Sequence, residues 1–286
     1  MIIAALVLLG LCFGSFVNAL VWRVHEQASR KKKNKELSIW HGRSMCPHCK
    51  HTLSALDLIP VLSWLFLRGR CRYCHKPISV QYPLVELALP VLFVLSYAVW
   101  PANLLFGRAS SLFHPGVWYI NAYFALWLVI LIGFLALTIY DLCWQLLPNR
   151  IVYPLTVLAF LTAIITVAAS SQHVHALWQE VWAVVVGGGI FYLLFQLSGG
   201  KWIGGGDVRL GWLIGLIVAT PAKSLLCIFT AGVAGSLVSL PLLATKKLKR
   251  TSIIPFGPFL MLGAVIAVLW GSQILDWYNH QLLGLN

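Results

Sequence analysis

Long apolar runs recur along the whole chain and decide its fold class. They cover about residues 2–22, 83–100, 118–140, 151–170, 178–197, 208–220, 223–244 and 256–272. A helix needs roughly 20 apolar residues to cross the hydrocarbon core of a bilayer. Hydrophobic residues make up 59% of the chain and charged residues only 10%, which excludes an ordinary soluble domain. We therefore expect an all-α, polytopic membrane protein with about eight transmembrane helices.

Basic residues are distributed unevenly among the segments that connect these runs. Of 21 Lys and Arg residues, 19 fall in four segments: 12 in 23–82, one at Arg150, two in 201–209 and four in 246–250. Cytoplasmic loops of membrane proteins are enriched in Lys and Arg close to the membrane. The pattern therefore predicts that both termini are outside and the four basic segments are cytoplasmic. No small-residue cleavage site follows the first run, so we expect a retained helix at 1–22 instead of a signal peptide.

The most basic cluster, Lys31, Lys32, Lys33 and Lys35, comes soon after the first apolar run. The chain also carries a net charge of +13, a value that is common among nucleic-acid-binding proteins. Single-strand binders interleave basic residues with aromatic side chains that stack on bases, and no aromatic residue stands among these lysines. We therefore expect anionic membrane lipids as the partner of this cluster, and no nucleic acid.

Four of the seven cysteines lie in the one long polar segment, 23–82, as two Cys-x-x-Cys pairs. The pairs are Cys46 with Cys49 and Cys71 with Cys74, and 21 residues separate them. Two such turns present four sulfurs to one ion, as in tetrahedral structural zinc sites. A reducing cytoplasm argues against the alternative of two disulfides. The spacing thus predicts a structural Zn²⁺ site in a small cytoplasmic, zinc-ribbon-like insertion.

The remaining candidate ligands and nucleophiles near these pairs have simpler interpretations. His48 and His75 lie inside or beside the pairs, but four sulfurs already complete such a site, so we expect neither histidine to be a ligand. Cys143 stands two residues after an aspartate, but no histidine accompanies it as a general base, so we expect it to contribute to packing.

Acidic residues are scarce, and two of the eight stand at the ends of apolar runs on the predicted cytoplasmic side. Asp141 closes the third run and Asp207 opens the sixth, so both carboxylates are expected at the same membrane depth. Two carboxylates that share a site cannot both ionise easily, so one keeps its proton while the other activates water. Hydrolysis of an amide needs that division of roles. We therefore expect Asp141 and Asp207 to form a catalytic dyad, with an N-cap role for Asp207 as the alternative.

Two runs of glycine lie in the second half of the chain. Gly204, Gly205 and Gly206 precede Asp207, and without Cβ atoms they would let a substrate backbone approach closely, although a flexible linker would look similar. We therefore assign them as candidate substrate-binding residues. The glycines at 187–189 lie within an apolar run and are expected to form a close helix-packing surface.

Taken in order, several blocks of this chain resemble the type IV prepilin peptidases, bifunctional bacterial enzymes of the GxGD aspartyl protease group, over nearly the whole length. The blocks are Gly10, Gly14, Ser15, Phe16 and Asn18; Arg43, Ser44, Cys46, Pro47 and Cys49; Pro60, Ser63, Trp64, Gly69, Cys71, Cys74, Tyr82, Pro83 and Glu86; Asp141, Pro148 and Asn149; Gly204, Gly206 and Asp207; and Pro255, Phe256, Gly257 and Pro258. Two positions depart from the family pattern: Asn149, where many relatives carry Asp, and Ala55, where an aromatic residue is common.

The resemblance implies that Asp141 and Asp207 catalyse the cleavage of leader peptides from prepilins or pseudopilins at the cytoplasmic face of the bacterial inner membrane. It also implies methylation of the new N-terminal amine with S-adenosylmethionine, for which the residues themselves show no motif. Because the leaders of the family's substrates are basic, carboxylates such as Glu86 and Asp57 are the candidates for leader binding, with a salt bridge at a helix end as the alternative.

The expected organisation is a first transmembrane helix at 1–22, a cytoplasmic zinc-binding domain at 23–82 and a catalytic transmembrane domain at 83–286. A presenilin-like or preflagellin peptidase is the alternative enzyme, because the GxGD pattern also occurs in that wider group, but the cysteine pairs argue against it. A proton-coupled transporter, in which Asp141 and Asp207 relay protons, is the non-enzymatic alternative.

Overall fold

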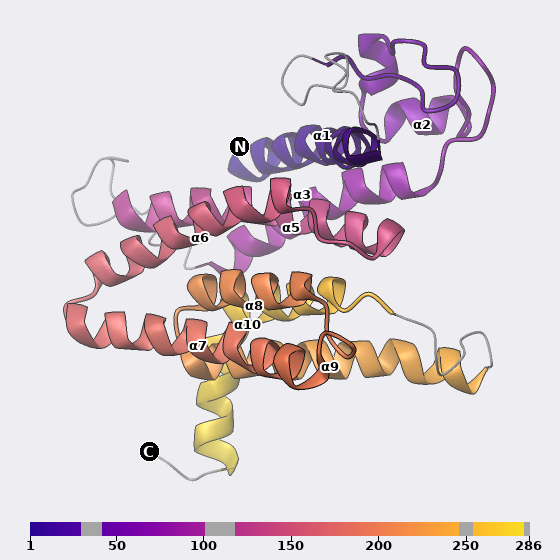
Figure 1. Ribbon diagram of the computed structural model, residues 1–286. Helices are drawn as coiled ribbons and strands as arrows, with labels where there is room; N and C mark the ends of the chain where they lie inside the picture. Colours follow the sequence, from indigo (N-terminus) through magenta and orange to yellow (C-terminus); the bar gives the residue numbers. More distant parts are fainter. Residues whose placement is uncertain (30–41, 101–117, 246–253, 283–286) are drawn as a thin grey trace. The chain divides into compact units, whose positions relative to one another are not determined.

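The computed structural model describes residues 1–29, 42–100, 118–245 and 254–282 (Figure 1). Within these residues the secondary structure consists of helices and turns with two isolated β-bridges, so the all-α class is confirmed. The described chain divides into two compact units: Met1–Ala98 with Leu131–Ala136 form unit 1, and Val99–Ile130 with Leu137–Asn286 form unit 2. The basic cluster at 31–35 lies outside the described residues, so its interaction with lipids stays a prediction.

All eight expected helices are present, and seven of them are long and apolar enough to cross a membrane. The seven are α1 (Ile2–Ser29), α3 (Gln81–Val99), α5 (Trp118–Trp144), α6 (Asn149–Ala169), α7 (His173–Ser198), α9 (Pro221–Ala244) and α10 (Gly257–Leu282). The expected span at 208–220 is instead α8 (Gly205–Val218), with 14 residues. At 1.5 Å per residue it is about 21 Å long, shorter than a hydrocarbon core of about 30 Å.

In unit 1, helices α1 and α3 cross closely because α1 carries glycines at the contact. A Cβ on Gly10 would lie 2.5 Å from the Cα of Pro90, and a Cβ on Gly14 would lie 2.7 Å from the Cα of Glu86. Real Cβ contacts are longer, so only glycine permits this approach. Residues 42–80 are the described part of the segment between the two helices.

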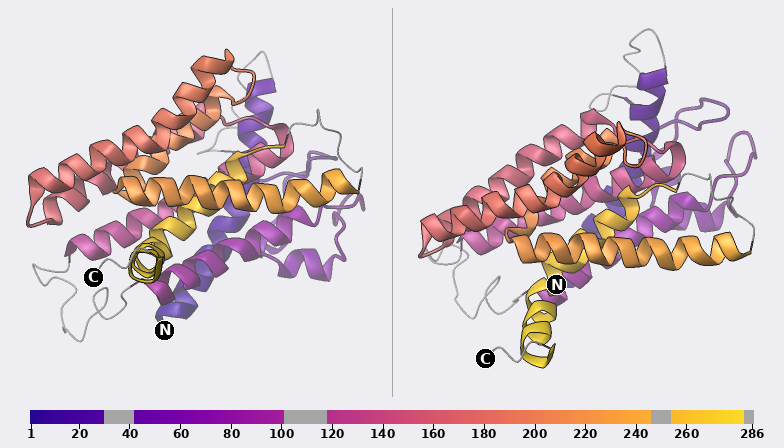
Figure 2. Two further views of the ribbon diagram at one scale, coloured as in Figure 1. Left: turned by 90° about the horizontal axis from the view of Figure 1, so that it is seen from below. Right: turned by 60° about the horizontal axis from the view of Figure 1, so that its bottom comes forward.

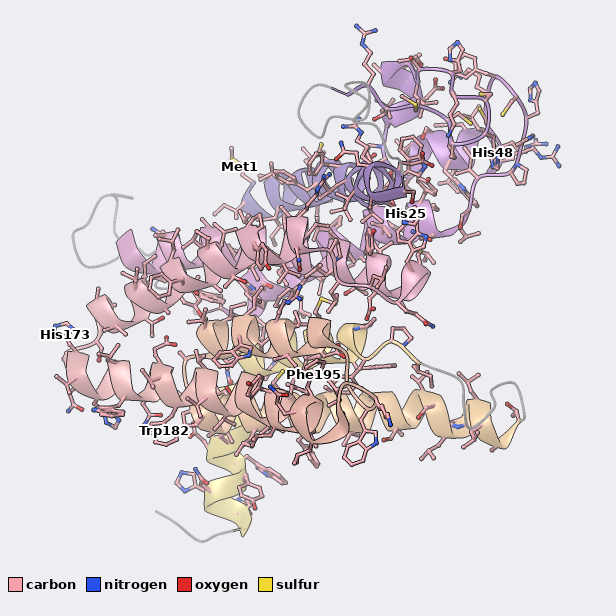
Figure 3. The ribbon with its side chains drawn as sticks, in the orientation of Figure 1. Met1, His25, His48, His173, Trp182 and Phe195 are labelled. Atoms are coloured by element: carbon pink, nitrogen blue, oxygen red, sulfur yellow. The ribbon has the colours of Figure 1, made fainter. Side chains whose placement is uncertain are left out.

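The connecting segment 42–80 is called the cysteine module here, and it contains two short helices, η2 (Ala55–Leu58) and α2 (Leu62–Phe66). Each cysteine pair lies beside one isolated antiparallel bridge, Met45 with Thr52 and Arg70 with Pro77. Figure 3 labels His48 in this module and His25 on α1. The module therefore has turns around its cysteines in place of an extended sheet.

In unit 2, α8 packs against α6, α7, α9 and α10, and Figures 1 and 2 show it alongside α7. The α7–α8 contact again depends on glycine: a Cβ on Gly187 would lie 2.9 Å from the carbonyl oxygen of Gly211, and one on Gly188 would meet the Trp212 ring at 2.6 Å. The expected packing role is therefore confirmed for these two glycines. Gly189 has only Val185 near its Cβ direction, at 3.9 Å, so it does not take part.

Candidate functional site

Asp141 lies in the last turn of α5, and its side chain is almost completely buried. The backbone N–H of Gly257, the first residue of α10, donates a hydrogen bond to its carboxylate. The first N–H groups of a helix have no partner within the helix and carry partial positive charge. The start of α10 therefore provides the favourable surroundings that a carboxylate at the C-terminal end of α5 would otherwise lack.

Gly257 is the position that sequence reasoning did not assign to the site. A Cβ built on Gly257 would lie 2.5 Å from Oδ2 of Asp141, far inside a van der Waals contact. In the sequence, Gly257 stood out only as part of the Pro255–Pro258 block of the family resemblance. Nothing in the local pattern predicts that it lies beside Asp141, which is 116 positions earlier. The structure thus makes Gly257 a direct neighbour of one predicted catalytic carboxylate.

Asp207 lies in the first turn of α8, outside the seven candidate membrane spans. Gly204 is the N-cap residue of α8, and its carbonyl oxygen accepts a hydrogen bond from the Asp207 backbone N–H at 3.1 Å. Burial of the side chain, and in addition the nearby negative charge of Asp141, raise the pKa of Asp207 to about 6. The two carboxylates predicted to form a dyad therefore both lie in unit 2, close enough for the charge of Asp141 to act on Asp207.

Contacts between the start of α8 and the turn that follows α5 hold the two aspartates in place. Gly206 packs against Leu147: a Cβ added to Gly206 would lie 3.2 Å from Cδ1 of Leu147. Three residues after Gly206, Arg209 donates a hydrogen bond from its guanidinium to the side-chain oxygen of Asn149, the first residue of α6. Asn149, one of the two departures from the family pattern, thus contributes a neutral acceptor to this contact.

The three glycines before Asp207 differ in what surrounds them. A Cβ added to Gly204 would lie 3.7 Å from Asp207 Oδ2, and a Cβ added to Gly205 would lie 3.9 Å from a ring carbon of Phe195. Both are ordinary van der Waals contacts. Of the three, only Gly206 has a neighbour closer than an ordinary contact. None of the three glycines has a positive φ. The residues with left-handed backbone conformation are Gly199 and Gly200, and Gly200 lies beside Phe195, which Figure 3 labels. Close approach of a substrate at Gly204 and Gly205 stays a prediction.

Chemically, this arrangement offers two neighbouring carboxylates with different surroundings. One of them, Asp207, has a raised pKa and so retains a proton more readily than an exposed aspartate. Each carboxylate also accepts a backbone hydrogen bond, Asp141 from Gly257 and Asp207 from Gly204, and such a bond favours a charged oxygen. A protonated carboxyl beside an ionised one can donate a proton to a carbonyl oxygen while the other carboxylate removes a proton from water.

The four predicted metal ligands form the second site. The sulfurs of Cys46, Cys49, Cys71 and Cys74 all lie within 4.8 Å of one another, and Cys46 Sγ is 3.9 Å from Cys74 Sγ. With Zn–S bonds of about 2.3 Å, a tetrahedral site places its sulfurs about 3.8 Å apart. The sequence prediction that these four residues are brought together is confirmed, and their geometry fits one Zn²⁺ ion.

Both cysteine turns have the same backbone design. The N–H of Cys46 donates to the carbonyl oxygen of His51, and the N–H of Cys71 donates to that of Lys76. In each turn, the residue four positions after the first cysteine, Lys50 or His75, has positive φ and donates its N–H back to that cysteine. This repetition supports one shared metal site over four unrelated thiols.

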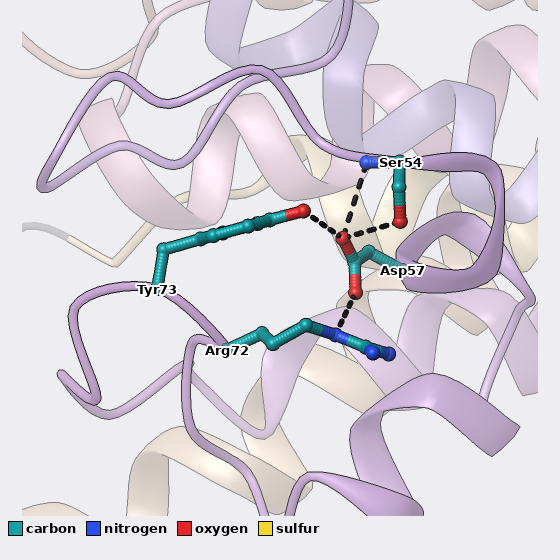
Figure 4. A network of polar contacts seen from close by, with 4 residues as sticks. All are labelled: Ser54, Asp57, Arg72 and Tyr73. Atoms are coloured by element: carbon teal, nitrogen blue, oxygen red, sulfur yellow. Dashed lines mark hydrogen bonds and ion pairs between the residues drawn. The ribbon is translucent and has the colours of Figure 1, made fainter.

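Asp57, one of the expected leader-binding carboxylates, is engaged within the cysteine module (Figure 4). It accepts hydrogen bonds from the Ser54 N–H and hydroxyl, from Tyr73 Oη at 3.0 Å and from Arg72 Nε at 2.7 Å. Burial alone would raise the pKa of Asp57, but these hydrogen bonds and the Arg72 charge lower it overall. Asp57 therefore ties the segment after the first cysteine pair to the second pair.

Glu86, the other expected leader-binding carboxylate, is buried in unit 1. Its Oε2 accepts a hydrogen bond from the backbone N–H of Val61 at 2.7 Å, and Ser15 donates to it from α1. Glu86 thus fastens the cysteine module to the crossing of α1 and α3. Its predicted role in leader binding stays a prediction.

Comparisons with known proteins cover both units. Residues 8–100 match the family described as Bacterial Peptidase A24 N-terminal domain, and residues 128–240 match the Type IV leader peptidase family. The chain is similar to proteins named prepilin leader peptidase/N-methyltransferase. The relative from Stutzerimonas stutzeri is 32% identical over 97% of this chain and 93% of its own length, and the relative from Legionella pneumophila is 30% identical over 95% and 92%. The Bacillus subtilis relative is 29% identical over 99% of this chain and 100% of its own length. No solved structure matches the chain.

Proposed function

Because this chain belongs to the prepilin leader peptidase/N-methyltransferase family, we propose that it cleaves leader peptides from prepilins or pseudopilins and methylates the N-terminus that cleavage exposes. The electrostatic interaction between the Asp141 and Asp207 carboxylates in unit 2 is the observation that supports the peptidase assignment. The match over residues 8–100, which include both cysteine pairs, favours this family over a preflagellin or presenilin-like peptidase.

In the proposed reaction, Asp141 and Asp207 share the acid and base roles. The ionised carboxylate takes a proton from water as the water oxygen attacks the scissile carbonyl carbon. The protonated carboxyl donates to the carbonyl oxygen, so that a diol forms. As the C–N bond then breaks, the proton on the first carboxyl passes to the leaving amine, and one hydroxyl of the diol returns its proton to the second carboxylate as the carbonyl re-forms. The raised pKa of Asp207 suits it to the protonated role.

The proposed location follows from the helices and the basic residues together. The seven candidate spans support a multi-pass protein of the bacterial inner membrane. Four segments hold 19 of the 21 basic residues, and these segments are proposed to face the cytoplasm. The ends of α5 and α8 that carry Asp141 and Asp207 adjoin two of these segments, so the dyad would act on leaders at the cytoplasmic surface.

Methylation requires a methyl donor, and the relatives' name implies S-adenosylmethionine. This molecule supplies an electrophilic methyl group, which the amine takes up through its nitrogen lone pair as the C–S bond breaks and the amine loses a proton. Zn²⁺ on Cys46, Cys49, Cys71 and Cys74 is proposed to be structural, since four sulfurs leave no open coordination position for water.

Cleavage of a prepilin leader by the purified protein in detergent tests the proposed peptidase function. We expect mass spectrometry to detect a released leader peptide and a shortened pilin. A transporter with Asp141 and Asp207 as proton relays would leave the prepilin intact, and that result would contradict the proposal.

The contact between Gly257 and Asp141 gives a further prediction. We expect Gly257→Ala to lower kcat for leader cleavage by about 10- to 100-fold, because displacement of a catalytic group by about 1 Å has effects of this size. The Cβ would lie 2.5 Å from Asp141 Oδ2 in the present geometry, so the carboxylate must move. The measurement is kcat and KM for a prepilin, with the melting temperature as a check on folding.

Gly232→Ala is the matched control, because a Cβ on this α9 glycine would meet no atom within 4 Å. This variant should cleave prepilin at the rate of the parent. A Gly257→Ala enzyme that also kept the parental kcat would show that the Asp141 carboxylate has room to adjust.

A further inference from the structure

Glu180 is a buried carboxyl group of unit 2 that the peptidase reaction does not use. It belongs to α7, one of the seven candidate membrane spans, and only 5% of its surface is exposed. Both side-chain oxygens are buried and have no hydrogen-bond partner within the described residues. An ionisable side chain at membrane depth is costly and marks a functional site by default. Glu180 therefore calls for a ligand.

The position of Glu180 is level with the end of α8. Helices α7 and α8 lie side by side and run in opposite directions (Figure 1). A Cβ on Gly215 of α8 would lie 2.8 Å from the carbonyl oxygen of Ala183 on α7. Glu180 comes one helical turn before Ala183, and Val218, the last residue of α8, comes about one turn after Gly215. The carboxyl group is thus beside the C-terminal end of α8.

Tyr123 of α5 links Glu180 to this helix end. Its hydroxyl donates a hydrogen bond to the carbonyl oxygen of Ile217 at 3.0 Å. Tyr123 also lies close enough to Glu180 for the charge of that carboxylate to act on it. A tyrosine hydroxyl has one proton to donate, and Ile217 takes it, so the Tyr123 oxygen offers Glu180 only lone pairs. Three kinds of oxygen, from a carboxylate, a phenol and a helix end, therefore gather here without a positive charge.

The end of α8 adds negative potential to that of Glu180. The last carbonyl groups of a helix have no partner within the helix and carry partial negative charge. With 14 residues, α8 is about 21 Å long, so a helix that starts at the proposed cytoplasmic surface ends inside a hydrocarbon core of about 30 Å. Oxygens of a short helix that ends inside a membrane are known to hold cations.

The basic residue at the start of α9, Lys223, is directed to a different partner. The next residue, Ser224, donates a hydrogen bond to a backbone oxygen of α7 at 2.8 Å, so this part of α9 adjoins α7. The stem of Lys223, however, lies against α10, where a Cβ on Gly271 would meet its Cγ at 3.2 Å, and the charge of Asp276 acts on it. The charge of Lys223 is thus matched from α10, and the oxygens of Glu180 stay unpaired.

We propose that Glu180 binds a monovalent metal cation, such as Na⁺, between α5, α7 and the end of α8. Oxygen atoms are the ligands that hard cations prefer, and the single carboxylate balances one positive charge, whereas Ca²⁺ sites commonly have several carboxylates. A Glu180 that is always protonated is the competing state, because a neutral carboxyl group needs no cation. This inference is independent of the proposed peptidase and methyltransferase functions.

The test is the melting temperature of the full-length protein in detergent, measured at one ionic strength in the chloride of Na⁺, K⁺ or N-methylglucamine. A ligand that binds only the folded protein stabilises it. We expect Na⁺ or K⁺ to raise the melting temperature of the parent by about 2 °C or more over N-methylglucamine, a bulky organic cation. Glu180→Gln keeps the shape of the side chain without its charge, so it should lose this rise and should melt above the parent in N-methylglucamine.

Glu86→Gln is the matched control, because Glu86 is also a buried carboxylate but accepts hydrogen bonds in unit 1. This variant should keep the full difference between the salts. Glu180→Asp retains the charge on a shorter side chain and should keep a smaller difference, which preserves the test if Glu180→Gln does not fold. Equal melting of the parent in all three salts would overturn the inference and assign Glu180 the protonated state, and an undiminished rise in Glu180→Gln would overturn it as well.

Discussion

Asp141→Asn and Asp207→Asn should each lower the rate of prepilin cleavage by about 10²- to 10⁴-fold, the contribution of one general acid or base. Asparagine has nearly the same shape as aspartate but neither removes a proton from water nor donates one from a carboxyl group. Asp141 is buried and Asp207 is half-buried in unit 2, and the charge of Asp141 acts on Asp207, so loss of either should remove the whole mechanism. Single-turnover cleavage of a prepilin by purified variants measures the effect.

Asp276→Asn provides the matched control, since Asp276 is an exposed aspartate on α10 and is not part of the dyad. The same chemical change there should leave cleavage at the rate of the parent. All three variants should melt like the parent protein, which would separate lost chemistry from lost folding. Near-parental turnover by Asp141→Asn or by Asp207→Asn would rule out an aspartyl mechanism for that residue.

Removal of zinc should unfold the cysteine module. Between α1 and α3 this module has only two short helices and two isolated bridges, so it has little structure that would persist without the metal. Structural zinc contributes about 10–16 kcal/mol to the folding of small zinc-binding peptides. We expect elemental analysis to find one zinc per chain, and chelation to make four additional thiols titratable and residues 42–80 sensitive to protease.

Cysteine variants test whether the four-cysteine cluster holds the zinc. Cys71→Ser should lose the zinc, because Cys71 belongs to the four-sulfur cluster, whereas Cys143→Ser should retain it. A metal-free protein whose four thiols titrate freely while the module resists protease would exclude a structural role for zinc. Prepilin cleavage by the chelated protein would show in addition whether unit 2 acts independently of the module.

The departures from expectation lie in contacts between residues that are distant in sequence. Asp57 was named as a candidate for leader binding with a salt bridge as the alternative, and its carboxylate accepts hydrogen bonds from Arg72 and Tyr73 of the second cysteine turn. Neither the spacing nor the composition of the chain indicates that pairing. Likewise, the run at 208–220 was counted among the expected membrane spans, but α8 has only 14 residues and is not one of the seven helices long enough to cross a membrane.

What the sequence determined by itself is the set of helices, the four clustered cysteines and the two aspartates at helix ends. Those features depend on hydrophobicity and spacing within contiguous segments, where the physical rules are local. Only the tertiary structure placed Gly257 against Asp141 and left Glu180 with two buried, unpaired oxygens. Both features arise where helices from different parts of the chain pack closely. At such a contact, one additional atom displaces a neighbouring group.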